Sequence, residues 1–257
     1  MDYNDLLKAH LKYGTTKEDI IKAMEYESIL ENVVIAPWWD HSIFLENDFK
    51  VVQENNKIYT ISKNRVKFSF IEIKGIGAPV NAEYVLPLGL TKCKNIIFIG
   101  AAGSLDEKIK IGDIVIPEYS ICGEGSSRYL NNNLEDEFGK KEYPSKSFNS
   151  EIMKVLDKKK IKYHYVPNFS TDSIFGEFYH LDKFIKMGCK TIEMETSNLF
   201  KCGSLIDANI SAIFCISDNI VSNKSLFSGR LEEEKERKKF VKHNVIPNII
   251  YEVFLRS

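Results

Sequence analysis

The stretch NIIFIGAAGSLDEKIKIGDIVIP, residues 95–117, decides the fold that the chain is expected to adopt. Asn95–Ile99 is a short, continuously apolar run, which is typical of a strand covered on both faces. It ends in the small residues Gly100–Ser104, and a second strand is predicted at Asp113–Pro117. Buried strands followed by loops indicate an open α/β sheet, which places its ligands beyond the carboxyl ends of its strands.

Strands and helices alternate on both sides of this stretch. Residues 1–31 are predicted to form two short amphipathic helices, with a capped start at Thr15-Thr16, as an extension to a core over 32–257. The other core elements predicted are a strand at Asn32–Ala36, a meander of strands over 49–73, helices from Gly75 to about Leu90 and at 150–160 and 177–187, strands at Tyr163–Pro167, Thr191–Glu193 and Ala212–Ser217, and a last helix that Pro247 kinks or splits. This alternation predicts a single three-layer α/β domain over 1–257.

Two polar segments are expected at the surface. Residues 131–150 are polar and are predicted to form a long loop. The charged run Glu232–Lys239, at the start of the last helix, is predicted to face solvent.

Composition limits the classes of function. The chain is 44% hydrophobic and 28% charged, as in ordinary globular proteins, and its formal net charge of −1 gives no electrostatic basis for binding nucleic acid or a membrane surface. The N-terminal segment MDYNDLLKAHLKYG lacks the apolar centre of a signal peptide. No apolar run approaches the roughly 20 residues of a membrane span. A cytoplasmic protein is therefore expected.

Cysteine and histidine usage gives no sign of a metal centre or cofactor. The five cysteines are scattered without a CxxC pair, and the five histidines form no HExxH-like group. Reduced, mostly buried thiols are expected. We therefore expect neither a metal ion nor a bound cofactor.

Two segments at predicted strand ends are candidates for binding. In Gly100–Ser104, small residues allow backbone N–H groups to face a ligand, although a tight turn explains them equally well. In Glu193-Met194-Glu195, alternate residues of a strand share a face, so both acids can aim into one cleft. Glu195 can accept two hydrogen bonds from a vicinal diol, and Met194 can pack under a sugar. The alternative is an ordinary helix N-terminus, where acids are favoured.

A third candidate, Ser217-Asp218-Asn219, follows the apolar strand AIFCI. An acid at the end of a core strand has a low-dielectric neighbourhood that raises its pKa, which makes Asp218 a candidate proton donor. A helix cap or Asx-turn is the alternative explanation.

Six segments together resemble the superfamily of nucleoside phosphorylases and nucleosidases, which includes purine nucleoside and uridine phosphorylases, methylthioadenosine/S-adenosylhomocysteine nucleosidases and futalosine hydrolase. They are KGIGAP (74–79), NIIFIGAAGSLDEKIKIGDIVIP (95–117), GEGSSRYL (123–130), TDSIFGE (171–177), TIEMETSNLF (191–200) and AIFCISDN (212–219). The resemblance covers about residues 32–254, and the combination of the glycine segment with GDIVIP, EMET and SDN is specific.

The resemblance implies a fold and a set of site residues. The fold would be α/β/α around a mixed, partly barrel-like sheet, in a homo-oligomer of two, three or six chains. Glu195 would hold the ribose hydroxyls, Met194 would line the sugar site, and Asp218 would protonate or hydrogen-bond to N7 of a purine. Phe175, or Ile174 beside it, would pack on the base. Further candidate binding residues are Glu193, Ala101 and Gly103.

The chain departs from this family at the phosphate site. Positions that carry phosphate ligands in the phosphorylases are occupied, with a loose alignment at Asn55, by Ala36, Asp40, Asn55, Phe98 and Ala101. None of these supplies the guanidinium group that a dianion requires. Phe98 is retained as a candidate neighbour of the substrate, and Arg128 is the one arginine near a motif that is a candidate substitute.

In the nucleosidases of this family an acid in the first loop activates water, and Asp40 lies close to that position. Beside Trp38 and Trp39, its pKa is predicted to be raised, so that it acts as a base near neutral pH. The alternative is that both tryptophans are packing residues and that Asp40 is merely solvated. Glu46 is a weaker candidate for the acid that activates water.

The sequence therefore predicts cleavage of the N-glycosidic bond of a purine-type nucleoside, and slightly favours water over phosphate as the acceptor. The first alternative is phosphorolysis at an atypical anion site of backbone N–H groups and Arg128. The second is a non-catalytic nucleoside-binding or storage protein, against which the presence of both Glu195 and Asp218 speaks.

Overall fold

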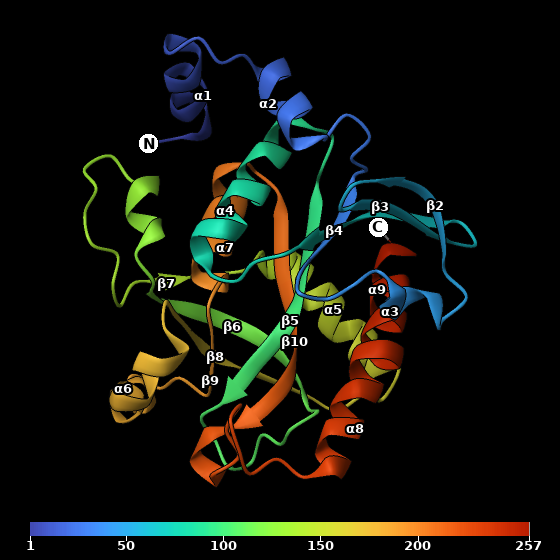
Figure 1. Cartoon of the computed structure of the whole chain (residues 1–257), viewed down its shortest axis with the longest axis vertical. Helices are drawn as coiled ribbons and strands as arrows, with labels where there is room; N and C mark the ends of the chain where they lie inside the picture. Colours follow the sequence, from blue (N-terminus) through green and yellow to red (C-terminus); the bar gives the residue numbers. More distant parts are fainter. Residues whose placement is uncertain (257) are drawn as a thin grey trace.

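The computed structural model describes residues 1–256, whose strands form one ten-stranded sheet (Figure 1). The strands are β1 (Asn32–Pro37), β2 (Lys50–Asn55), β3 (Ile58–Lys63), β4 (Val66–Ile73), β5 (Asn95–Ser104), β6 (Ile114–Gly123), β7 (Lys141–Glu142), β8 (Tyr163–Thr171), β9 (Thr191–Glu193) and β10 (Asn209–Asn219). Their order is β10-β6-β8-β9-β5-β1-β4-β3-β2, and β7 pairs with β6. Because β10 also pairs with β5, five strands close into a ring. The predicted mixed, partly barrel-like sheet is confirmed.

Helices cover both faces of the sheet, as the three-layer prediction requires. Helices α4 (Ala78–Val85) and α7 (Thr196–Leu205) lie together on one side, and α5 (Lys146–Lys158) and α9 (Ile246–Phe254) lie together on the other (Figure 1). The remaining helices are α1 (Tyr3–Lys12), α2 (Lys17–Met24), α3 (Ser42–Leu45), α6 (Ile174–Lys186) and α8 (Glu232–Phe240), with 3₁₀ turns at Leu86–Leu90, Ser126–Leu130 and Ile220–Ser222. Within residues 1–256, no helix has both the length and the apolar character needed to cross a bilayer.

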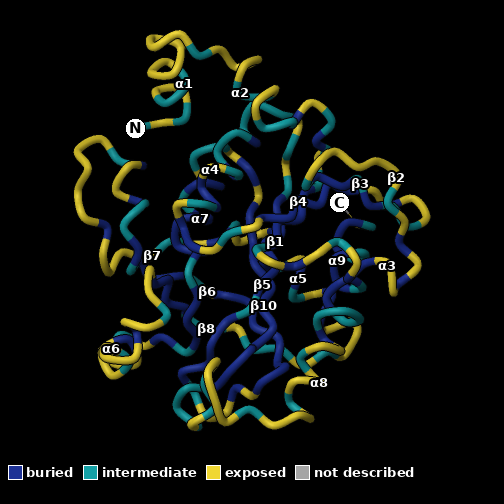
Figure 2. The backbone as a smooth tube through the Cα atoms, in the orientation of Figure 1, coloured by how far each residue is buried: buried dark blue, intermediate teal, exposed yellow. Residues whose placement is uncertain are grey.

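Strand β5 contributes side chains to two separate cores. Ile97 and Ile99 pack in the cluster that contains residues of α5 and α9, whereas Ile96 and Phe98 pack in the cluster that contains residues of α4 and α7. Successive side chains of a strand point to opposite faces, so a strand covered on both sides must be apolar at every position. This explains why the run Asn95–Ile99 was recognisable, and Figure 2 shows the central strands as the most continuously buried part of the chain.

Strands β5 and β10 are longer than predicted. Gly100–Ser104 was expected to be a loop with free backbone N–H groups, but it continues β5 and pairs in parallel with β10, with Ala101 opposite Cys215. The expectation of a loop is wrong because the pairing partner lies far along the chain and local composition does not reveal it. Between Ile216 and Asp218 the register shifts, so Ser217 is an extra residue in β10. Such bulges redirect neighbouring side chains.

The N-terminal extension and the thiols agree with expectation. In α2 the Thr16 hydroxyl accepts a hydrogen bond from the Asp19 backbone N–H at 3.2 Å, which is the predicted capped start. The hydroxyl of Tyr26 donates to the Tyr84 carbonyl at 2.8 Å, and so attaches the extension to α4. All five cysteines are free, and four of them are buried. That residues 1–257 form a single domain stays a prediction.

Pro247 splits the last helix, as predicted. Helix α8 ends at Phe240, a π-helical turn occupies Val241–Val245, and α9 begins at Ile246. Proline has no N–H group to donate to the carbonyl four residues earlier, which belongs to His243. The Asn47 side chain donates to that carbonyl instead, at 2.5 Å. The break in the helix is therefore compensated by a contact from the segment after α3.

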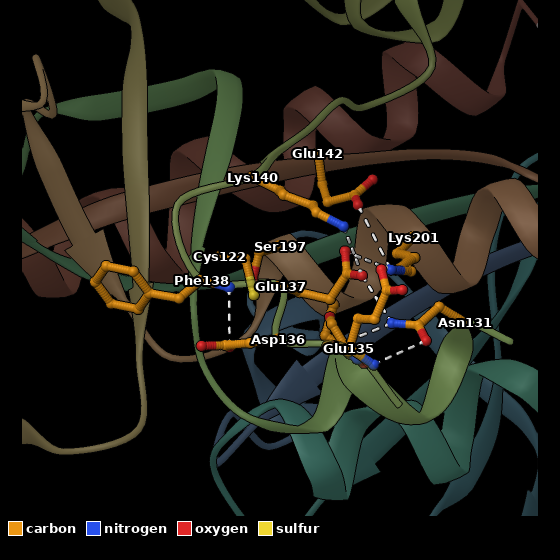
Figure 3. Close-up of polar contacts among 12 residues, drawn as sticks. Cys122, Asn131, Glu135, Asp136, Glu137, Phe138, Lys140, Glu142, Ser197 and Lys201 are labelled. Atoms are coloured by element: carbon orange, nitrogen blue, oxygen red, sulfur yellow. Dashed lines mark hydrogen bonds and ion pairs between the residues drawn. The ribbon is translucent and has the colours of Figure 1, made fainter. Parts of the chain in front are cut away.

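The polar segment 131–150 is fixed to the body of the protein. The carboxylate of Glu137 is only 5% exposed and pairs with Lys201 of α7 at 2.9 Å and with Lys140 at 3.0 Å (Figure 3). The Asn131 side chain donates to the same carboxylate at 2.8 Å. These contacts lower the pKa of Glu137 to about 2, against the effect of burial, which raises it. The expected loop is confirmed in part, since α5 already begins at Lys146.

We predict that Glu137→Gln lowers the free energy of unfolding by about 2 kcal/mol at pH 7, because it leaves Lys201 without its charged partner. Since the folded pKa of Glu137 lies near 2, below the ordinary value of 4.5, its stabilisation is present above pH 4.5 and is lost as the pH falls toward 2. Urea unfolding at pH 7 and pH 3.5 measures this difference. The exposed neighbour Glu135 provides the control Glu135→Gln, and equal losses in both variants would contradict the prediction.

Candidate active site

A pocket of about 230 Å³ lies where β1, β5 and β10 end and where β9 passes into α7. The sequence-predicted residues that line it are Ala101, Gly103, Ile174, Glu193, Met194, Glu195 and Asp218. The other lining residues are Pro37, Trp38, Trp39, Ile76, Ala102, Glu177, Ile192, Ser217, Leu226 and Lys238. Segments that are far apart in the sequence therefore converge on one pocket, called the active-site pocket below.

Glu193 holds the β9–α7 junction rather than presenting a free carboxylate. Its carboxyl oxygens accept hydrogen bonds from Asn168 and Ser170 of β8 at 2.7 and 2.5 Å. They also accept from the backbone N–H groups of Glu195 and Thr196, at 2.7 and 2.9 Å, and from the Thr196 hydroxyl at 2.9 Å. Complete burial nevertheless raises the pKa of Glu193. The side chain is a positioning group for Glu195.

Glu195 points into the pocket and is held from two sides. One carboxyl oxygen accepts a hydrogen bond from the Gly77 backbone N–H at 2.6 Å, and the other accepts from the Met194 N–H at 3.2 Å. Gly77 has φ +94°, a left-handed conformation that glycine adopts without strain. Burial, followed by the negative charge of Glu193, raises the pKa of Glu195 to about 8. Each oxygen keeps acceptor capacity for a ligand hydroxyl.

Asp218 is buried beside the glycine segment. The Ser217 hydroxyl donates to one of its carboxyl oxygens at 2.5 Å, and burial raises its pKa. A Cβ atom at Gly103 would lie 3.1 Å from the other oxygen, so only glycine leaves this approach free. The bulge at Ser217 and the missing side chain at Gly103 together set the position of the acid.

Glu177 is a pocket residue that the sequence reasoning missed. It lies in the first turn of α6 and is 7% exposed. Among the described residues, none donates a hydrogen bond to its carboxyl group or forms an ion pair with it. Burial, and then the neighbouring charge of Asp218, raises its pKa to about 8. Helical spacing places it on the same face as Ile174, which is the signal that could have identified it.

Lys238 was also missed, because the run Glu232–Lys239 was expected to face solvent throughout. Most of α8 does face solvent, but Lys238 is half-buried and lines the pocket. Burial lowers the pKa of its amine. Lys238 is the one lysine among the described lining residues, and those residues include no arginine.

Four predicted residues do not line the pocket. Phe98 is buried in the core that includes α7 and packs edge-on against Phe214 at 6.1 Å, because even-numbered positions at the start of β5 face that core. Phe175 is 88% exposed, since only its neighbour Ile174 on α6 turns inward. Arg128 forms an ion pair with Asp136 at 3.8 Å.

Asp40, the fourth of these residues, lies just outside the pocket lining with its side chain 55% exposed. Burial acts to raise its pKa, but hydrogen bonds from Ser42, including its backbone N–H at 2.7 Å, outweigh this effect and lower it. The predicted raised pKa is therefore wrong. Glu46, the weaker candidate, is also absent from the lining and contacts His243 at 3.0 Å.

A sequence model described as the phosphorylase superfamily matches residues 39–245. The chain belongs to this superfamily. It is 27% identical over 158 residues to a DeoD-type purine nucleoside phosphorylase of an Exiguobacterium species, and this alignment spans 60% of the chain and 64% of the relative. The chain thus matches less than two thirds of that relative's length.

Solved structures show the same fold. Uridine phosphorylase of Vibrio fischeri superimposes with a TM-score of 0.74 at 19% identity, over 90% of this chain and 94% of that one. The methylthioadenosine/S-adenosylhomocysteine nucleosidase of Campylobacter jejuni superimposes with a TM-score of 0.68 at 12% identity, over 89% of this chain and all of that one. At these identities the likeness concerns the fold of the superfamily.

We predict that Glu177→Gln stabilises the protein above neutral pH. The folded state keeps the Glu177 proton up to about pH 8, whereas an ordinary glutamate loses it near 4.5, so this group reduces stability as the pH rises from 4.5 to 8. Glutamine does not titrate, so the variant should have a free energy of unfolding higher than wild type by on the order of 1–3 kcal/mol at pH 8.5. Thermal unfolding at pH 5 and 8.5 measures it. Asp182→Asn, an exposed change on the same helix, is the control, and a variant no more stable than wild type at pH 8.5 would contradict the prediction.

Proposed function

We propose that this chain cleaves the N-glycosidic bond of a purine-type nucleoside in the active-site pocket, with water slightly favoured over phosphate as acceptor. The observation that carries the proposal is the convergence of Glu195 and Asp218 on one pocket whose lining, within the described residues, includes a lysine but no arginine. Membership of the phosphorylase superfamily limits the chemistry to be considered.

The two acids suit the two halves of the substrate. Cleavage of the C–N bond builds positive charge on the sugar and negative charge on the departing base. Asp218, whose raised pKa favours the protonated form, can donate a hydrogen bond or a proton to the base as it leaves. Glu195, fixed by the N–H groups of Gly77 and Met194, can accept hydrogen bonds from the ribose hydroxyls. Met194 can pack on the sugar.

Glu177 gives the base side of the pocket a second carboxyl group. With a pKa of about 8 it is mostly protonated at neutral pH and offers one donor and one acceptor. A purine edge presents both kinds of group, so the neutral acid can complement it. Ile174, on the same face of α6, can contact the ring in place of the exposed Phe175.

The electrostatics of the pocket support water as acceptor. Phosphate is a dianion and requires charge-assisted hydrogen bonds, for which arginine is the most suitable residue. Lys238 is half-buried, and burial weakens its charged form. The lowered pKa and exposed position of Asp40 give no support to its role as a base, so we assign water activation to no residue. The electrophilic sugar of a dissociative transition state makes a strong base less necessary.

Phosphorolysis remains the second candidate, because the Exiguobacterium relative is a phosphorylase and Lys238 can contact one anion. Arg128 does not contribute, since it lies outside the pocket lining. Assembly into a homo-oligomer and a cytoplasmic location stay predictions.

The acceptor is tested by incubating the protein with inosine or adenosine in phosphate-free buffer and in 50 mM phosphate. We expect release of free base and free ribose at similar rates in both buffers, measured by chromatography of the products. Formation of ribose 1-phosphate with strict dependence on phosphate would replace hydrolysis by phosphorolysis. Absence of base release in either buffer would favour a binding role.

The role of Asp218 is tested by Asp218→Asn, which keeps the shape and removes the proton donor. General acid catalysis contributes about 10²- to 10⁴-fold, so we expect kcat to fall at least 100-fold with little change in KM. Asp182→Asn, outside the pocket, should retain wild-type rates. If Asp218→Asn kept more than a tenth of the activity while remaining folded by circular dichroism, the assignment of the proton donor would be wrong.

A further inference from the structure

We propose that Asp40, His41 and Glu72 form a binding site for a divalent transition-metal ion, of which Zn²⁺ is the best match, beside the wall of the active-site pocket. One ligand atom from each of these side chains lies within 4.8 Å of the others. The site is separate from the glycosidic chemistry proposed above, since none of the three residues lines the pocket.

The fold brings the three residues together from two neighbouring strands. Asp40 and His41 lie in the turn between β1 and α3, and Glu72 lies near the end of β4. These strands are parallel, with Ala36 opposite Glu72. The Trp38 backbone N–H donates to the Ile73 carbonyl at 2.9 Å, which continues the pairing into the turn. The turn is thereby held next to Glu72.

His41 presents an unused nitrogen to the cluster. Its Nδ1 atom is buried and has no hydrogen-bond partner, and it lies 3.6 Å from the Asp40 carboxylate. The imidazole ring stacks on Tyr59, with ring centroids 4.0 Å apart and planes inclined by 24°. Stacking restricts the rotation of the ring and so holds Nδ1 beside the Asp40 carboxylate. A buried nitrogen without a partner is costly unless a donor or a metal ion satisfies it.

Glu72 supplies the second carboxylate of the cluster. It is 9% exposed, and among the described residues none donates a hydrogen bond to its carboxylate or forms an ion pair with it. Neither of its oxygens is among the fully buried atoms that lack a partner, so this carboxylate is within reach of solvent and free to bind a cation. Asp40, in contrast, is more than half exposed, so a cation can reach the cluster from solvent.

The donor set selects the class of ion. One imidazole nitrogen with two carboxylates suits Zn²⁺ and related transition metals, whereas Mg²⁺ and Ca²⁺ prefer oxygen ligands alone. In a tetrahedral zinc site with bonds of about 2.0 Å, ligand atoms are roughly 3.3 Å apart. In the present structure the ligand atoms lie within 4.8 Å of one another, so binding requires them to move closer together. Three protein ligands leave a fourth position for water, as in other zinc sites with three protein ligands.

A bound ion would connect the turn between β1 and α3 to strand β4. The residues immediately before Asp40 are Trp38 and Trp39, which form part of the pocket wall. Fixing Asp40 and His41 against Glu72 would therefore order this wall. The same wall is also held by Lys242, whose ammonium group lies over the Trp39 ring at 4.7 Å from the ring centroid.

The site is tested first with the metal-stripped full chain titrated with Co²⁺, whose visible absorption reports coordination without any assay of activity. We expect one Co²⁺ per chain with an imidazole-type spectrum, displaced by an equivalent of Zn²⁺ and not by millimolar Mg²⁺. Zn²⁺ at 100 µM should also raise the melting temperature by several degrees. Failure to bind Co²⁺ at 100 µM would overturn the proposal.

Variants separate this cluster from adventitious binding. His41→Ala and Glu72→Gln should each weaken Zn²⁺ binding at least 10-fold and remove the thermal shift, whereas His10→Ala, at an exposed histidine of α1, should leave both unchanged. Without metal, Glu72→Gln should melt close to the wild-type temperature, since no hydrogen bond or ion pair among the described residues depends on this carboxylate. That result shows that the variant folds. Equal Zn²⁺ affinity in all three variants would place the ion elsewhere and overturn the proposal.

Discussion

The site depends on the hydrogen bonds that converge on the carboxyl group of Glu193. They join side chains of β8 to the backbone at the start of α7, across the short strand β9. The Glu195 N–H is part of this set, so the backbone of Glu195 is fixed by its neighbour. A carboxyl group satisfied on both oxygens costs little to bury, whereas one that loses a partner becomes a destabilising buried group. The geometry of Glu195 therefore follows from the closure of the barrel.

The elements that could be predicted from the sequence are those that a local pattern of residues determines. Asn95–Ile99 is a strand because an apolar run without helical spacing fits a doubly covered sheet, and the helix break at Pro247 follows from a missing N–H group. Glu195 and Asp218 were identifiable because each acid lies at the end of a buried strand and matches a family motif. The individual strands and the helix break thus rest on short-range chemistry, whereas the barrel-like sheet was expected only from the resemblance to the family.

The errors arise where distant segments decide. Gly100–Ser104 was taken for a loop because its strand partner begins about a hundred residues later, at Asn209. Phe98 and Phe175 were assigned to the substrate although their backbone positions turn them away from it. Glu177 and Lys238 were missed because a charged residue on an exposed helix looks the same in sequence whether or not its side chain reaches a pocket. The proposed metal cluster could not be predicted either, because Glu72 approaches His41 only through the pairing of β4 with β1.

Burial of the pocket acids bears directly on the acceptor proposed above. Glu177, Glu193, Glu195 and Asp218 share one small volume, and burial raises the pKa of each of them. A raised pKa favours the neutral form of each acid, which reduces the negative charge that a neutral nucleoside would meet in the pocket. A phosphate dianion in the same volume would raise their pKa values further and would meet one half-buried lysine as its counter-charge. The proposed preference for water therefore rests on the charge of the whole pocket rather than on any single residue.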